Sequence, residues 1–191
     1  MNTLFPIFLK GDFLKFLIVG GGNVGLEKLE ALLKNSPEAK VTLVAPLIKD
    51  EIVELTKTHS IDLYYEPYSV DFLKFANVVI AGTDSSEVNK QVQQDCKANN
   101  ILVNVADTPD LCDFYLGSIV KKGDLKIGIS TNGKSPTFAK RFREILEEIL
   151  PDSLQETLDN LQSIRNKLKG DFTYKVNKLN EITREMNNPK P

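Results

Sequence analysis

A group of glycines follows a short apolar run near the start of the chain. Gly20, Gly22 and Gly25 have the G-x-G-x-x-G spacing of a dinucleotide-binding turn, between the apolar run at 16–19 and a helical pattern. In such a turn the first glycine permits the tight change of direction, the second lets the backbone approach a pyrophosphate, and the third lets the helix pack close to the sheet. The helix N-terminus then holds the phosphates. The alternative is an ordinary glycine-rich turn of an α/β domain. The predicted cofactor contacts here are Gly20, Gly21, Gly22, Asn23, Val24 and Gly25.

The second apolar run ends at Ala45, Pro46 and Leu47, which departs from the usual pattern of these folds. An acidic residue normally follows this strand and holds the ribose hydroxyl groups. Here the first carboxylate downstream is Asp50, inside the next helical pattern. The backbone around Pro46 can still line an adenosine pocket. No arginine follows the strand to bind a 2′-phosphate, although Lys49 is close, so we expect NAD rather than NADP.

Polar residues follow the fourth and fifth apolar runs. Ligands of doubly wound sheets bind at the carboxyl ends of the strands. We therefore expect Thr83 to contact the cofactor and Asp107 to lie beside the nicotinamide end of the cofactor. A carboxylate in a partly desolvated cleft can take or hold a proton near neutral pH, which makes Asp107 the candidate catalytic residue. The alternative is a turn role, because Asp-Thr-Pro-Asp is also a good turn sequence. Asp84 and Asp110 have the same two interpretations.

A second candidate anion site lies further along the chain, at Lys134 and Ser135. Ser135 and Pro136 are typical of a helix N-cap and of the first helical position. A helix N-terminus beside a lysine can bind an anion. The alternative is a capped helix with a solvated basic face, since Lys140 and Arg141 follow on the same helix.

The elements that must position these residues alternate between strand and helix over residues 1–112. Near-continuous apolar strands separated by helices predict a parallel sheet that is covered on both faces. Right-handed crossovers then give an α/β fold of the doubly wound, Rossmann type. Strand-length apolar runs occur at 16–19, 41–44, 61–65, 78–81 and 101–105. Helical spacing of apolar residues occurs at 23–34, 47–58 and 85–98.

The pattern changes after residue 112. Two β-rich runs, at 114–121 and 125–130, flank Lys-Gly-Asp and predict a β-hairpin, which a helix from Pro136 to about residue 150 follows. An isolated hairpin is unstable in water, so it must pack on the first domain or pair with a second copy, and we favour a homodimer. The expected division is a nucleotide-binding domain at 1–112, a dimerisation hairpin and helix at 113–150, and a C-terminal helical region at 151–191.

Composition excludes several classes of function. The net charge of −2 provides no bulk attraction to nucleic acid or to an anionic membrane. No segment reaches the roughly 18 uninterrupted apolar residues of a membrane helix. One histidine and two separated cysteines argue against a metal site and against a disulfide framework. Since the N-terminus also lacks the layout of a secretory signal, we expect a cytoplasmic protein without nucleic-acid or membrane partners.

Several motifs, taken in order, match one known pattern over residues 3 to about 150. They comprise the glycine turn with Leu26-Glu27-Lys28, the second strand through Pro46, Ala81-Gly82-Thr83-Asp84, Asn104-Val105-Ala106-Asp107, Ser118-Ile119-Val120, and the segment from Ile129 to Pro136. In this combination the chain resembles the precorrin-2 dehydrogenase / sirohydrochlorin ferrochelatase family, the N-terminal module of siroheme synthase.

The resemblance implies NAD-dependent oxidation of precorrin-2 to sirohydrochlorin in siroheme biosynthesis, by an intertwined homodimer, with iron insertion at the same site in some members. The key aspartate of the family matches Asp107, and its small hydroxyl residue matches Ser130 or Thr131. The many carboxylates of the substrate are then partners for Lys134 and for the helix N-terminus at Ser135. The resemblance also implies that the cofactor can bind without the acidic residue that normally holds the ribose hydroxyl groups.

Two other functions stay open. A non-catalytic NAD-sensing regulatory module would share the glycine turn, but such modules usually stop after the α/β unit, before any hairpin. A dedicated chelatase that has lost dehydrogenase activity would have no need for the intact glycine turn. Both interpretations of Asp107, as a base and as a group that orients the substrate, also stay open.

Overall fold

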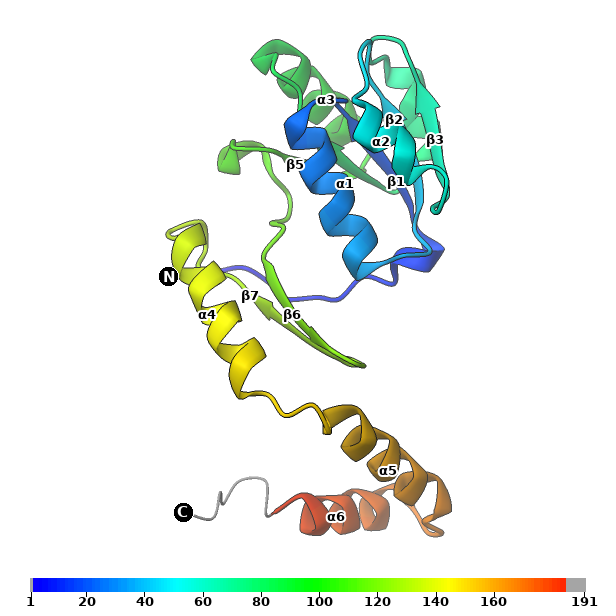
Figure 1. The fold of residues 1–191 in the computed structure, drawn as a ribbon, viewed down its shortest axis with the longest axis vertical. Helices are drawn as coiled ribbons and strands as arrows, with labels where there is room; N and C mark the ends of the chain where they lie inside the picture. The colour runs from blue at the N-terminus through cyan, green and yellow to red at the C-terminus, as the bar shows by residue number, and fades with distance from the viewer. Residues whose placement is uncertain (1, 185–191) are drawn as a thin grey trace. The chain divides into compact units, whose positions relative to one another are not determined.

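The computed structural model describes residues 2–184 and divides into two compact units, the first ending at Leu116 and the second beginning at Gly117. The first unit is built on a five-stranded sheet in the order β3-β2-β1-β4-β5 (Figure 1). All neighbouring strands are parallel, and β1 lies between β2 and β4. The predicted doubly wound, Rossmann-type sheet is therefore confirmed. The strands are β1 Lys15–Val19, β2 Lys40–Val44, β3 Ile61–Tyr64, β4 Val78–Ala81 and β5 Leu102–Val105.

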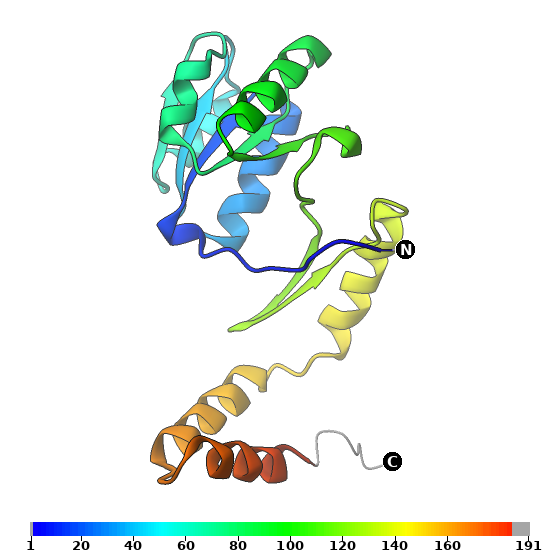
Figure 2. The ribbon, with the colours of Figure 1, turned by 180° about the vertical axis from the view of Figure 1, so that it is seen from behind.

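Helices cover both faces of this sheet (Figures 1 and 2). Side chains of α1 and α2 pack on one face, and those of α3 and η2 pack on the other. Successive β1 residues alternate between the two cores: Leu17 and Val19 face α3, whereas Phe16 and Ile18 face α1. Burial on both faces explains why the strands are apolar at nearly every position. The helices are α1 Asn23–Asn35, α2 Asp50–Leu55 and α3 Ser86–Ala98, with the 3-10 helices η1 Gly11–Phe13, η2 Val70–Phe75 and η3 Pro109–Leu111.

The second helix is shorter than its apolar pattern predicts, beginning at Asp50 instead of residue 47 and ending at Leu55. The reason is a contact with the glycine turn, where the Lys49 amide donates to the Gly21 carbonyl oxygen at 3.1 Å. This bond keeps the segment before Asp50 irregular and leaves Leu47 86% exposed.

The second unit consists of a hairpin and three helices. Its strands are antiparallel and are joined by Gly123 and Asp124, with Gly123 in the left-handed region at φ +59°. The hairpin is as predicted, except that its first strand begins at residue 118, not 114. Gln155 ties α5 to the turn by accepting a hydrogen bond from the Asp124 amide at 2.8 Å. The elements are β6 Ser118–Lys122, β7 Leu125–Ile129, α4 Pro136–Ile149, α5 Leu154–Lys167 and α6 Phe172–Thr183.

Helix α4 is apolar on two sides. Its Ala139 is buried, and the helix packs against β6. A second set of apolar side chains, Phe138, Phe142, Ile145 and Ile149, is between 41% and 66% exposed, and we call these four residues the α4 stripe. Over residues 2–184, no helix combines the length and the apolar character needed to cross a bilayer.

Candidate functional site

The turn between β1 and α1 is too crowded for side chains at three of its glycines. Gly20 has a φ of +124°, and a Cβ there would meet the carbonyl group of Gly82. A Cβ on Gly25 would overlap the carbonyl oxygen of Gly20, so α1 could not lie this close to the strand. A Cβ on Gly21 would meet the backbone at Leu47, because the segment that follows β2 lies against the turn. The fold itself therefore requires these glycines.

Gly22 differs from its neighbours. Apart from its chain neighbours, no residue would have an atom within 4 Å of a Cβ at this position, and its φ of −86° is open to any residue. The protein alone thus gives no reason for a glycine here. The open space lies at the N-cap of α1, where a dinucleotide-binding fold holds the pyrophosphate, so the residues fit a bound dinucleotide.

The N-terminus of α1 is also free to receive an anion. No side chain caps it and no acidic residue lies in its first turn, whereas Ser85 caps α3 and Ser135 caps α4. The first amide groups of a helix have no partner within the helix and need one outside it. Lys49 lies nearby, where its Nζ donates to Asn23 Oδ1 at 2.9 Å and is paired with the Glu51 carboxylate at 3.0 Å.

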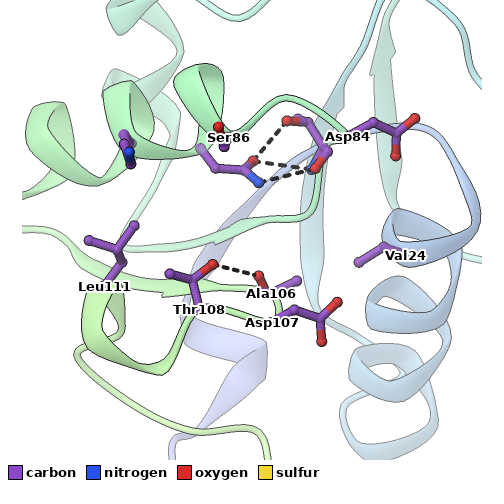
Figure 3. Close-up of a pocket in the computed structure, with 10 residues that line it drawn as sticks. Val24, Asp84, Ser86, Ala106, Asp107, Thr108 and Leu111 are labelled. Atoms are coloured by element: carbon purple, nitrogen blue, oxygen red, sulfur yellow. Dashed lines mark hydrogen bonds between the residues drawn. The ribbon is translucent and has the colours of Figure 1, made fainter.

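A cavity of about 260 Å³ opens beside this helix end (Figure 3). Its walls come from the carboxyl ends of β4 and β5 and from the first turns of α1 and α3. Because the strand order reverses between β1 and β4, the cavity lies at the switch point where doubly wound sheets bind ligands. The lining residues are Val24, Thr83, Asp84, Ser86, Asn89, Lys90, Ala106, Asp107, Thr108 and Leu111.

Asp107 lines the cavity on the side of Val24 (Figure 3). Its φ is +56°, and the Thr108 amide donates to the Val105 carbonyl oxygen at 3.3 Å, which closes a tight turn around it. Aspartate is among the few residues other than glycine that adopt this conformation readily. The turn around Asp107 therefore covers residues 105–108, whereas the sequence pattern predicted one over residues 107–110, and it directs the exposed carboxylate to the rim of the cavity.

Asn89 holds the loop that contains Thr83. Its Oδ1 accepts from the Thr83 amide at 3.2 Å and from Thr83 Oγ1 at 2.8 Å, and its Nδ2 donates to the Thr83 carbonyl oxygen at 3.0 Å. All polar atoms of this buried side chain are satisfied, so the clamp restricts the loop after β4. Thr83 consequently faces the cavity from a fixed backbone.

The predicted site residues are distributed over both units. The glycine turn, the backbone of Ala45, Pro46 and Leu47, Thr83 and Asp107 all lie at the carboxyl edge of the parallel sheet. Ser130, Thr131, Lys134 and Ser135 lie in the second unit, in the loop between β7 and α4.

The three hydroxyl groups of that loop hold its backbone. Ser130 Oγ accepts from the Asn132 amide at 3.2 Å, Thr131 Oγ1 from the Ser135 amide at 3.1 Å, and Ser135 Oγ from the Phe138 amide at 3.1 Å. The predicted N-cap at Ser135 is thereby confirmed. A hydroxyl that accepts in this way still has a proton to donate to a ligand. Lys134 is exposed beside them.

Sequence reasoning missed Asn89 and Lys90 as cavity residues. The signal for Asn89 was present, since it shares one helical face with the buried residues Val92 and Cys96. An amide on such a face must have hydrogen-bond partners. Within residues 2–184, no group of three or more His, Cys, Asp or Glu side chains can hold a metal ion.

Two family models match the chain. The one described as putative NAD(P)-binding covers residues 7–118, and the one described as sirohaem biosynthesis protein central covers residues 122–149.

Full-length relatives are similar over most of this chain. The siroheme synthase of Psychrobacter arcticus is 40% identical over 176 residues, which are 92% of this chain and 31% of that protein. The siroheme synthase of Pseudoalteromonas translucida is 40% identical over 169 residues, 88% of this chain and 35% of that protein. The chain thus spans about a third of the length of these curated relatives.

A solved structure is similar over nearly the whole chain. SirC, a precorrin-2 dehydrogenase, matches with a TM-score of 0.75 and 26% sequence identity, covering 94% of this chain and 89% of that one.

Proposed function

The chain belongs to the family of the N-terminal module of siroheme synthase, and on this premise we propose that it catalyses the NAD-dependent oxidation of precorrin-2 to sirohydrochlorin. One observation carries the proposal for this chain. An uncapped helix N-terminus with open space at Gly22 lies beside a cavity that Asp107 lines. A nucleotide site and a candidate proton acceptor therefore meet at the same edge of one sheet.

The cofactor would be held by the backbone of the glycine turn, by Thr83, and by the segment from Ala45 to Leu47. A bound nicotinamide supplies the hydride acceptor of the oxidation. The contacts of Lys49 support NAD over NADP, since its Nζ is engaged by Asn23 at 2.9 Å and by Glu51 at 3.0 Å. The cation nearest the end of β2 is thus already partnered within the protein, which does not favour a 2′-phosphate.

Asp107 would accept the proton that accompanies the hydride. Oxidation of a carbon–carbon bond to a double bond removes one hydride and one proton, and the Asp107 carboxylate can receive the latter. Its side chain is exposed at the rim of the cavity, so a macrocycle bound over it would exclude water from the carboxylate. The tight turn around Asp107 limits its motion, which favours a defined orientation toward the substrate.

The loop between β7 and α4 would bind substrate carboxylates. Precorrin-2 carries many of them, and the exposed Lys134 provides a cation beside the positive end of the α4 dipole. Ser130, Thr131 and Ser135 stabilise the loop by accepting backbone hydrogen bonds and can donate their own protons to the ligand. In this proposal they bind and orient the substrate.

We also propose that the protein is a homodimer. The α4 stripe leaves four apolar side chains exposed on one helix, and Phe138 and Phe142 stack with their rings 6.0 Å apart. The adjoining two-stranded sheet packs on the other side of α4 and leaves the stripe uncovered. A second copy of the same surface would cover the stripe.

Location in the cytoplasm stays a prediction.

Insertion of ferrous iron is the second candidate function. Two carboxylates, Asp84 and Asp107, line the same cavity from neighbouring strands. Insertion of a metal releases protons from pyrrole nitrogens, and these two groups are able to accept them. Iron would be a substrate here and not a resident cofactor.

The test is to incubate the purified protein with enzymatically made precorrin-2 and NAD without metal, and to follow NADH and sirohydrochlorin by absorbance. We expect stoichiometric formation of both. Ferrous iron added to the same cuvette then tests chelation. A folded protein that forms no NADH from precorrin-2 but inserts iron into separately supplied sirohydrochlorin is a chelatase only, and one that binds NAD and does neither reaction is a regulatory module.

A further inference from the structure

We propose that Cys112 is a positioning residue whose thiol holds the turn that presents Asp107. The inference rests on the proposed function, in which the Asp107 carboxylate meets the substrate. Cys112 itself does not line the cavity. It lies behind the turn, among the residues packed against the core between α3 and the sheet.

A single sulfur atom contacts both corners of the turn. Cys112 Sγ lies 3.2 Å from the amide nitrogen and 3.1 Å from the carbonyl oxygen of Val105, and 3.4 Å from the carbonyl oxygen of Thr108. Val105 and Thr108 are the first and last residues of the turn, and Asp107 lies between them. The thiol is therefore a bridge across the base of the turn.

The chemistry of a thiol suits these partners. A thiol is both a weak acceptor and a weak donor, so it can accept from the Val105 amide while sharing its proton with the two carbonyl oxygens. Burial raises the pKa of the Cys112 thiol, and the group consequently keeps the proton that it donates. Asn104 Nδ2 approaches the same sulfur at 3.5 Å.

The chain around Cys112 is fixed independently of its sulfur. The Asp113 amide donates to the Val103 carbonyl oxygen at 2.8 Å, and Asp113 Oδ2 accepts from the Val103 amide at 3.0 Å. Asn104 Nδ2 also donates to the Phe114 carbonyl oxygen at 2.8 Å. These bonds hold residues 113–114 alongside β5, and Cys112 consequently lies next to the turn. Removal of the thiol should therefore loosen the turn and not the whole segment.

The turn gains from this support because the backbone bond that closes it, from the Thr108 amide to the Val105 carbonyl oxygen, is long at 3.3 Å. The thiol adds a second link between the same two residues. Without the sulfur, Val105 and Thr108 lose a shared partner, and the Asp107 carboxylate becomes free to take several orientations. A small misplacement of a catalytic group can cost a large factor in rate.

The experiment compares Cys112→Ala and Cys112→Ser with Cys96→Ala, a matched control. Cys96 is buried in the same core and no polar contact of its sulfur is seen within the described residues. We expect Cys112→Ala to lower kcat for precorrin-2 oxidation about tenfold, with KM and the Kd for NAD within about twofold of the parent protein. Cys112→Ser should recover most of the rate, because a hydroxyl can donate and accept. Cys96→Ala should lower the melting temperature and leave kcat unchanged.

Hydrogen exchange supplies a readout that does not depend on activity. The Val105 amide donates to the sulfur, so we expect it to exchange faster in Cys112→Ala and at the parent rate in Cys96→Ala. Unchanged exchange at Val105, or a parent kcat in Cys112→Ala together with a lower melting temperature, would show that the thiol only fills space. If the parent protein does not oxidise precorrin-2, the proposed function fails, while the exchange data still decide whether Cys112 holds the turn.

Discussion

Asp107 combines a backbone requirement with a chemical one. Its φ of +56° suits Asp, Asn and Gly, whereas only Asp among these carries a carboxylate. Asparagine at this position would therefore keep the turn and lose the base. This makes the two requirements separable by mutation.

We predict that Asp107→Asn lowers the turnover of precorrin-2 by about 100-fold or more, the usual range for a lost general base. The Kd for NAD and the melting temperature should stay close to those of the parent. Asp107→Ala should lose turnover to the same degree and also some stability, because alanine disfavours positive φ. The measurement is single-turnover absorbance with isothermal titration of NAD. An Asn variant that turns over at the parental rate would remove Asp107 from the mechanism.

Gly22 allows cofactor binding to be separated from folding. Apart from its chain neighbours, no residue has an atom within 4 Å of a Cβ at Gly22, and the residue is the N-cap of α1. Aspartate is a better N-cap than glycine, by a few tenths of a kcal/mol or more.

We predict that Gly22→Asp abolishes measurable NAD binding while the free energy of unfolding stays equal or rises slightly. The side chain fills the open space and places a negative charge where the pyrophosphate would lie. Fluorescence titration with NAD and urea denaturation measure the two quantities. Normal NAD affinity in this variant would contradict the placement of the cofactor at the glycine turn.

At the scale of elements, the approach of α1 to the sheet depends on Gly25. The backbone of this residue contacts the Gly20 carbonyl group so closely that a methyl group cannot be inserted without moving the helix. The Val24 side chain, at the cavity wall, belongs to the same turn of helix. Movement of α1 would therefore change both stability and the cavity.

We predict that Gly25→Ala destabilises the protein by about 1–3 kcal/mol, the usual cost of inserting an extra carbon into a packed site. The matched control is Gly22→Ala, which adds the same methyl group three residues earlier into open space. It meets no crowding and should cost less than about 1 kcal/mol, the loss expected when alanine replaces glycine at an N-cap. Urea denaturation of both variants decides the matter, and equal stability of the two would show that α1 adjusts without cost.

At the scale of the whole molecule, the α4 stripe has no cover within the described residues of the second unit. Its four side chains lie on one face of α4, while Lys140 lies on the opposite face. An exposed apolar face of this kind usually marks an interface between proteins.

We predict that sedimentation gives the mass of two chains for the parent protein and of one chain for Ile145→Lys. A lysine in place of Ile145, which is 52% exposed, interrupts the stripe with a charge but does not disturb the buried core of either unit. The helical circular dichroism signal should be retained. Lys140→Ala, on the other face, should remain dimeric. A parent protein that sediments as a monomer would overturn the proposed assembly.

The sequence alone is sufficient for the features that short-range chemistry controls. Apolar runs of strand length predicted all five parallel strands, because a strand that is buried on both faces must be apolar throughout. Ser135 was found as an N-cap, since a cap bonds an amide only three residues away. The glycine spacing placed the turn after β1, where backbone crowding requires glycine.

Tertiary structure alone decides how separate segments meet. The shortening of α2 follows from the bond between Lys49 and Gly21, and the open space at Gly22 is visible only once α1, β2 and β4 are in place. The thiol of Cys112 contacts Val105 seven residues earlier because Asp113 returns the chain alongside β5. Such contacts depend on the closure of loops, and neither residue propensity nor hydrophobic periodicity carries a signal for loop closure. Sequence reasoning therefore identified Asp107 as the catalytic candidate but did not identify the residues that hold it in position.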